Sequence, residues 1–151
     1  MKLHALKRAL FAASLLALCG APGFGATVEG LDVVTATGSH HYEVEIANDD
    51  ATRERGLMLR EKMAPDHGML FEFPAREPVT FWMKDTLIPL DMVFIDIDGT
   101  VRRVAEGAKP RSEDLIRSGD PVTGVLELNA GQAAAIQLKP GDKVEFPFFL
   151  H

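Results

Sequence analysis

The 151-residue chain contains one cysteine, so it cannot form an internal disulfide bond. It has no Cys-x-x-Cys motif, which excludes thioredoxin-type redox chemistry. It also lacks the His-Glu-x-x-His motif of zinc proteases, the Gly-Lys-Ser phosphate loop and the Gly-x-Ser-x-Gly nucleophile elbow. These absences exclude several enzyme classes that can be recognised from a sequence motif. The sequence contains no motif that predicts a metal or an organic cofactor.

Basic residues are also few. The chain has 16 Lys and Arg against 22 Asp and Glu, for a formal net charge of -6. Nucleic-acid binding uses clustered Lys and Arg to neutralise phosphates, so this acidic balance argues against a nucleic-acid partner. Apolar residues make up 46% and charged residues 25%, which is the composition of a soluble globular protein, and the length suits one domain.

The N-terminal residues have the three-part pattern of a secretory signal peptide. Three basic residues come first, namely Lys2, Lys7 and Arg8. An uncharged apolar run then covers residues 9–18, and small, turn-forming residues follow to residue 26. The apolar run is too short for a stable transmembrane helix, so we expect an exported protein, periplasmic or secreted, with no membrane span after cleavage.

Cleavage after Gly25 would make residues 1–25 the signal peptide. It would leave residues 26–40 as an N-terminal segment and residues 41–151 as a single globular domain. Cys19 offers an alternative, because a lipid could be attached there, but Leu18 stands where a lipoprotein normally has a small residue. We therefore favour simple cleavage, and a retained signal acting as an anchor is a third alternative.

Short β-rich stretches separated by turns dominate the remainder of the chain. We expect strands at residues 28–37, 41–47, 69–73, 77–83, 90–97, 100–105, 122–128 and 144–150. The apolar run 90–97 predicts a strand covered on both faces, and Asp98-Gly99 predicts a hairpin after it. The predicted fold class is α+β, mainly β: a compact antiparallel barrel or sandwich of about eight short strands.

Two helices complete this prediction, one near the start and one short helix near the end. Asn48-Asp49-Asp50 provides N-cap residues for a helix over residues 51–63. Gly56 inside that helix costs about 1 kcal/mol relative to alanine, which we interpret as a place where another element packs closely. Asn129 and Gln132 have capping-box spacing for the second helix, which would extend to residue 138.

A polar and aromatic cluster marks the candidate binding site. Residues 81–91 combine the only tryptophan with acid, amine and hydroxyl side chains between two apolar strands, which is typical of a small-molecule pocket. The predicted ligand-binding residues are Arg55, Trp82, Lys84, Asp85, Thr86, Asp91 and Glu127. The structural alternative is that Asp85 and Thr86 cap a turn while Asp91 satisfies backbone donors or forms an ion pair.

The same segments resemble a known family. The motifs are Arg55-Gly56-Leu57-Met58, Gly68-Met69-Leu70-Phe71, Phe81-Trp82-Met83-Lys84-Asp85-Thr86, Pro89-Leu90-Asp91 and Leu126-Glu127-Leu128. In this order they resemble an exported family catalogued as domain of unknown function 192. The resemblance implies a compact, mainly β domain with a helix near its start, and it implies no activity. The family usually has Asn where this chain has Asp85.

Three functional hypotheses follow. The first is a small-ligand-binding module of the cell envelope, whose ligand is a small polar molecule such as a sugar or a peptidoglycan fragment. The second is a hydrolase or lyase acting on an envelope saccharide, with Asp91 and Glu127 as its acid–base pair if they lie within roughly 5 to 10 Å. The third is a copper-binding protein that uses the thioethers of Met58, Met63, Met69, Met83 and Met92, although methionine also fills gaps in cores.

Overall fold

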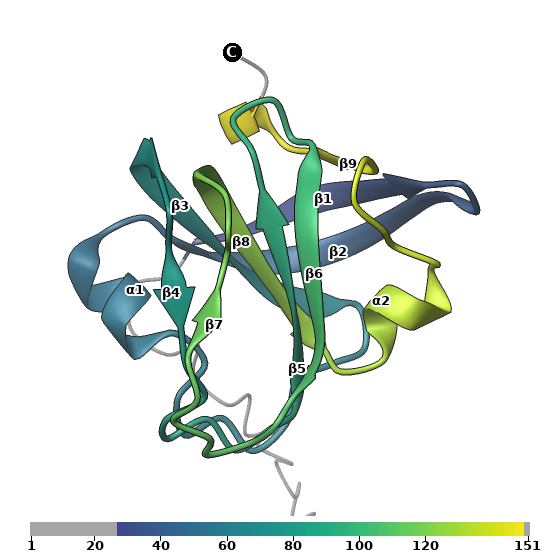
Figure 1. Cartoon of the computed structure of the whole chain (residues 1–151). Coiled ribbons are helices and arrows are strands. Elements are labelled where there is room, and N and C mark those ends of the chain that lie inside the picture. The colour runs from purple at the N-terminus through teal and green to yellow at the C-terminus, as the bar shows by residue number, and fades with distance from the viewer. Residues whose placement is uncertain (1–26, 150–151) are drawn as a thin grey trace, which may run out of the picture.

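The computed structural model describes residues 27–149, which form a curled seven-stranded sheet, a two-stranded ribbon and two short helices (Figure 1). The strand order in the large sheet is β6-β5-β8-β3-β2-β1-β9. Its strands are β1 Val28–Thr35, β2 Gly38–Ala47, β3 His67–Glu77, β5 Leu90–Ile95, β6 Val101–Ala108, β8 Val122–Asn129 and β9 Lys143–Glu145. The ribbon pairs β4 Thr80–Phe81 with β7 Ile116–Arg117, and the two helices are α1 Asp50–Arg55 and α2 Gln132–Ala135. A 3-10 turn, η1 Pro147–Phe149, follows β9.

The predicted mainly β fold with one helix near each end is confirmed, with nine strands within residues 27–149. Neighbouring strands of the large sheet are antiparallel except β2 and β3, which run parallel. The sheet includes β1, so residues 28–35 belong to the same structure as the strands that follow. The predicted signal peptide and Cys19 lie outside the described residues. No helix in the described part of the chain is long and apolar enough to cross a membrane.

The centre of the sheet is buried on both faces. One apolar cluster joins β1, β2, β5, β8, β9 and α2 and lies inside the curl. A second cluster covers the opposite face of β3, β5 and β8 with residues from the connecting segments. All six residues of β5 are buried, as the continuous apolar run predicted, and so are residues 122–128 of β8. A polar side chain on either strand is therefore withdrawn from bulk water.

Helix α1 begins as expected and ends early. The Asp49 side chain accepts a hydrogen bond from the backbone N–H of Thr52 at 2.8 Å, and the Thr52 hydroxyl accepts one from the Asp49 N–H. The helix then stops at Arg55 rather than at residue 63, because Gly56 has φ 47° and ψ -136°, a conformation that other residues rarely adopt. The expected close packing is present: a Cβ atom on Gly56 would lie 3.2 Å from Cζ of Phe71.

Helix α2 lies within the predicted range, but its predicted cap is wrong. Gly131 occupies the N-cap position and no side chain of the helix caps it. The Asn129 side chain instead donates to the carbonyl oxygens of Met63 and Ala64, at 3.2 and 2.9 Å. This contact ties the end of β8 to the segment that precedes β3.

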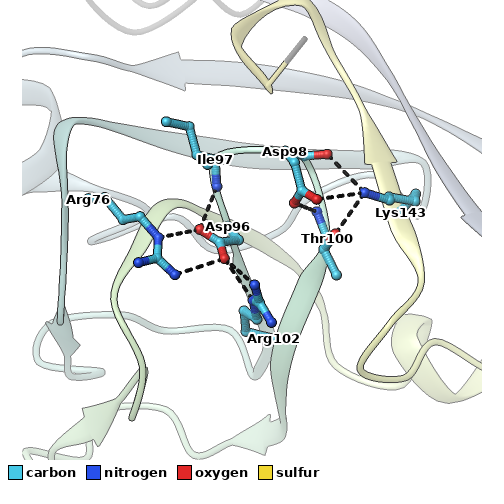
Figure 2. Close-up of polar contacts among 7 residues, drawn as sticks. All are labelled: Arg76, Asp96, Ile97, Asp98, Thr100, Arg102 and Lys143. Carbon is cyan, nitrogen blue, oxygen red and sulfur yellow. Dashed lines mark hydrogen bonds and ion pairs between the residues drawn. The ribbon is translucent and has the colours of Figure 1, made fainter. Parts of the chain in front are cut away.

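The turn between β5 and β6 is fixed by a buried carboxylate (Figure 2). Asp96, which is 3% exposed, accepts hydrogen bonds from Arg76 at 2.6 and 3.0 Å, from Arg102 and from the backbone N–H of Ile97. Hydrogen bonds from the Arg76 guanidinium, supported by Ile97 and Arg102, hold the pKa of Asp96 far below its ordinary value. The two arginines come from β3 and β6, so Asp96 joins three segments of the sheet.

The same hairpin meets β9 and nearly closes the curl at one corner. Lys143 lies 3.1 Å from the Asp98 carboxylate and 2.7 Å from the Thr100 hydroxyl (Figure 2). Hydrogen bonds, first from Thr100 and then from Lys143, lower the pKa of Asp98 to about 2. The backbone N–H of Val144 donates to the carbonyl of Gly99 at 2.8 Å, which places the predicted Asp98-Gly99 turn against β9.

Candidate functional site

A cleft of about 1130 Å³ opens on the face of the sheet that lies outside the curl. Its lining residues come from helix α1 and the turn after it, from the end of β3, from β4 and from the segment after β4. Figure 1 shows α1 beside β4. Glu127 reaches the cleft from β8. Six of the seven predicted ligand-binding residues line this cleft: Arg55, Trp82, Lys84, Asp85, Thr86 and Glu127.

Glu127 is the most unusual of these residues. It lies in the middle of β8, opposite Met69 of β3 and Met92 of β5, and it is 4% exposed. Among residues 27–149, no group donates a hydrogen bond to its carboxyl and no cation pairs with it. Burial alone raises the pKa of Glu127 to about 8. The carboxyl is therefore a polar group in an apolar setting whose hydrogen-bonding capacity faces the cleft.

Aromatic rings line the same cleft as this carboxyl. Phe81 makes edge-to-face contacts with Phe71, Phe73 and Phe94, with ring centroids 5.0, 6.4 and 6.4 Å apart. Phe71, Phe73 and Phe81 line the cleft, while Phe94 belongs to the cluster beneath it. Such contacts fix ring positions more tightly than burial alone, so this wall is preorganised.

The rim of the cleft carries both positively and negatively charged side chains. The tryptophan, Trp82, is 44% exposed, and the Lys84 ammonium lies 5.3 Å from the centroid of its ring. Neither Lys84 nor Arg55 forms an ion pair with another described residue. Arg53 is committed elsewhere, because it pairs with Asp50 at 2.6 Å and donates to the Glu72 carbonyl at 2.8 Å. Two cations at the rim are thus available to a ligand.

The segment after β4 is held by backbone hydrogen bonds from two other loops. Asp85 has φ 56°, and its carbonyl accepts from the N–H of Leu59 at 2.8 Å. The carbonyl of Thr86 accepts from the N–H of Arg111 at 3.0 Å, while the Thr86 N–H donates to the carbonyl of Met83. Asp85 and Thr86 therefore form a turn, as the structural alternative held, and the same turn presents them to the cleft.

Asp91 lies elsewhere. It is fully buried, and its carboxylate accepts hydrogen bonds from the backbone N–H groups of Gly107, Gly131 and Ala133 at 2.8, 2.9 and 3.0 Å. It therefore fastens β6 and the start of α2 to β5. It stands opposite Leu128, on the face inside the curl, so it does not line the cleft.

The five methionines do not converge on an open site. Met69, Met83 and Met92 are buried in the apolar cluster beneath the cleft, Met63 packs against that cluster, and Met58 lines the cleft. Within the described range 27–149, no three His, Cys, Asp or Glu residues gather in a group that could hold a metal ion.

Several lining residues were not predicted as site residues, namely Phe71, Phe73, Glu54 and Glu77. The sequence identified Phe71 only as a core residue, because its motif is a short apolar strand. Its place beside Gly56 depends on the crossover between the parallel strands β2 and β3. No local pattern reports that crossover.

Comparison with known proteins gives a family but no activity. A model of the family DUF192, described as "Uncharacterized ACR", matches residues 33–146. A crystal structure of a proposed transcription regulator from Sinorhizobium meliloti 1021 is 50% identical, with a TM-score of 0.78 over 80% of this chain and 94% of that one. A protein of unknown function from Novosphingobium aromaticivorans DSM 12444 is 35% identical, with a TM-score of 0.81 over 93% and 100%. No curated protein matches the chain.

Proposed function

We propose that this chain, which belongs to the uncharacterized family DUF192, is an exported module of the cell envelope that binds a small polar molecule in the cleft. A saccharide or a peptidoglycan fragment is a suitable ligand, because Trp82 can stack on a ring while polar groups surround it. Glu127 would contact the ligand from the floor. Arg55, Lys84, Asp85 and Thr86 would hydrogen-bond to it from the walls.

The observation that carries this proposal is the unpartnered carboxyl of Glu127. Burying such a group without a hydrogen bond costs folding free energy, and a leucine or methionine would pack there without that cost. An arrangement that destabilises the free protein is expected where a side chain is kept for contact with a ligand. The preorganised aromatic wall and the available cations at the rim support the same conclusion.

Tryptophan fluorescence tests the proposal, because the chain has one tryptophan and it stands at the rim of the cleft. The titrants are glucose, N-acetylglucosamine, muramyl dipeptide and D-alanyl-D-alanine, with saturation-transfer NMR to detect millimolar binding. We expect a saturable change with at least one titrant. It should weaken at least tenfold in Glu127→Gln at pH 8, where the carboxylate is available to form the charge-assisted hydrogen bond that the substitution removes.

Glu72→Gln is the matched control, because it makes the same chemical change on the neighbouring strand β3 at a residue that does not line the cleft. Binding in this variant should equal that of the unmodified chain. Absence of any response in both measurements, or equal weakening in the two variants, would rule out this function for the cleft.

The proposed export rests on the pattern of residues 1–25. Expression in a Gram-negative host followed by mass spectrometry of the periplasmic fraction tests it. A chain beginning at residue 26 is expected there, and a full-length chain found only in the cytoplasm would contradict export.

The two alternative functions gain no specific support. Asp91 and Glu127 face opposite sides of the sheet, so they do not form a pair that could act on one substrate. The buried methionines pack as apolar side chains do. The Sinorhizobium protein is described as a transcription regulator, but the net negative charge of this chain argues against nucleic-acid binding.

A further inference from the structure

We propose that the cleft selects ligands carrying a primary ammonium group, which pairs with the Glu127 carboxylate at the floor. This inference rests on the proposed small-ligand function and specifies its ligand class: small organic amines such as amino sugars or aryl-alkyl amines. The arrangement of charges between floor and rim supports it.

Among residues 27–149, the floor offers an acceptor and no cation. Beside Glu127 the buried lining residues are Leu57, Phe71 and Val79, all apolar, and Thr86. The Thr86 hydroxyl can donate to the carbonyl of Lys84, although at a long 3.4 Å. An anionic ligand group placed here would meet a carboxyl and aromatic rings without a compensating positive charge. An ammonium group would supply the hydrogen bonds and the charge that this carboxyl lacks.

The cations stand at the other end of the cleft. Arg55 and Lys84 are both exposed. The exposed lining residues also include the carboxylates of Glu54, Glu77 and Asp85. A ligand with its ammonium group inward and hydrogen-bonding groups outward therefore matches the cleft from floor to rim.

The aromatic wall also favours a positively charged ligand group. Aromatic faces attract cations, and the effect is larger where water is excluded. Two cations of the protein already use rings at this site, because Arg53 lies 5.7 Å from the Phe73 centroid and Lys84 lies 5.3 Å from the Trp82 centroid. The buried ring of Phe71 and the ring of Phe81 that packs on it would face the ammonium group of a ligand.

Because Glu127 binds a proton, pairing with an ammonium group predicts a characteristic pH dependence of ligand affinity. Burial raises the pKa of Glu127 to about 8, so near pH 7 the carboxyl is mostly protonated. An ammonium ligand needs the carboxylate, so its affinity should rise as pH rises toward 8. A neutral ligand that accepts a hydrogen bond from the protonated carboxyl should show the opposite trend.

The other charged groups at the cleft come from three elements. Asp50, Arg53, Glu54 and Arg55 come from α1, Glu77 from the end of β3, and Lys84 and Asp85 from the segment after β4. The residues opposite Glu127 on β3 and β5 are methionines, which do not titrate. No histidine is among the lining residues. Glu127 is thus the cleft group expected to change its protonation between pH 6 and 8.

Two matched probe series test the inference in the full folded protein. The first is 6-amino-6-deoxyglucose, glucose and glucuronate, which place an ammonium, a hydroxyl and a carboxylate on the same ring position. The second is phenethylamine and 2-phenylethanol. Dissociation constants are measured by saturation-transfer NMR and Trp82 fluorescence at pH 6, 7 and 8. At pH 8 at least one amine should bind tenfold or more tightly than its uncharged partner, and its dissociation constant should fall about tenfold from pH 6 to pH 7.

Glu127→Gln should abolish both the amine preference and the pH dependence, while Glu72→Gln should retain both. In the unmodified chain, a saturating amine should also move the carboxyl ¹³C titration of Glu127 to lower pH. Tight binding of glucose or 2-phenylethanol with no amine preference would overturn the inference and leave the small-ligand function standing. Failure of every probe, together with failure of the earlier titrants, would overturn both.

Discussion

Asp91 and Glu127 lie on adjacent strands and project from opposite faces of the same sheet. Asp91 of β5 stands opposite Leu128, and Glu127 of β8 stands opposite Met92, so the pleat directs the two carboxyls apart. The first accepts three backbone hydrogen bonds, while the second has no partner among the described residues. Two buried acids separated by one step of the pleat thus have different roles, one in the fold and one at the cleft.

Asp91→Ala should be strongly destabilising, because it leaves three backbone N–H groups without their acceptor. We expect a loss of about 3 kcal/mol or more in the free energy of unfolding, measured by urea denaturation. Glu106→Ala is the control, because Glu106 is exposed on the strand that carries one of the three donors, and its change should stay within about 0.5 kcal/mol. Equal losses in the two variants would contradict the structural role of Asp91.

Glu127 should make the stability of the protein fall as pH rises. Its pKa is about 8 in the folded chain and 4.5 in its ordinary setting, so the folded state binds more protons between these values. Relative to Glu127→Gln, the unmodified chain should lose up to about 1.4 kcal/mol of unfolding free energy per pH unit between pH 5 and 8. Urea denaturation across this range measures the difference. Parallel pH profiles for the two proteins would show that Glu127 ionises normally.

The fold could be predicted where the signals are local. Alternation in residues 42–46, the uninterrupted apolar run of β5 and the Asp98-Gly99 turn each report on neighbouring residues, and the structure has strands and a hairpin there. The parallel pairing of β2 with β3 could not be predicted, because it depends on where the chain returns after α1. The early end of α1 could not be predicted either, because the sequence does not show that Gly56 adopts φ 47° or that it lies against Phe71.

The candidate site could be predicted in composition but not in orientation. The segment that holds Trp82, Lys84, Asp85 and Thr86 is contiguous, so its residues were bound to lie near one another. The side of the sheet to which Asp91 points could not be read, because a strand buried on both faces has no polar alternation to mark its direction. Only the strand register, in which Glu127 stands opposite Met92, shows that Glu127 lies on the cleft face.

Gly56→Ala should destabilise the protein and disturb the aromatic wall. The backbone at Gly56 has φ 47°, and an added Cβ would lie 3.2 Å from Cζ of Phe71. Conformational strain alone costs roughly 1 to 2 kcal/mol, and displacement of the ring adds to it. Gly119→Ala separates the two effects, because Gly119 also has positive φ but an added Cβ there would have no neighbour within 4 Å. Thermal and urea unfolding should show the larger loss for Gly56→Ala, and a smaller one would contradict the close packing.

Asp96→Asn should lower stability at neutral pH and much less in acid. The substitution removes the negative charge that binds Arg76 and Arg102, so we expect a loss of about 2 kcal/mol at pH 7, since hydrogen bonds to charged groups exceed neutral ones. The pKa of Asp96 is lowered in the folded chain, so this stabilisation is present above its ordinary value near 4 and is lost as pH falls further.

Urea denaturation of the unmodified chain and of Asp96→Asn, at pH 7 and at pH 2.5, measures this effect. The difference between them should shrink at the lower pH. The exposed residue Asp114, replaced by Asn, serves as the control, since within the described part of the chain its side chain accepts only from the Ser112 hydroxyl. Because both arginines are nearly half exposed, each can return to water when Asp96 is changed, so the loss should stay below that of a fully buried ion pair. A difference that is unchanged at pH 2.5 would mean that the charge of Asp96 does not hold the corner of the sheet.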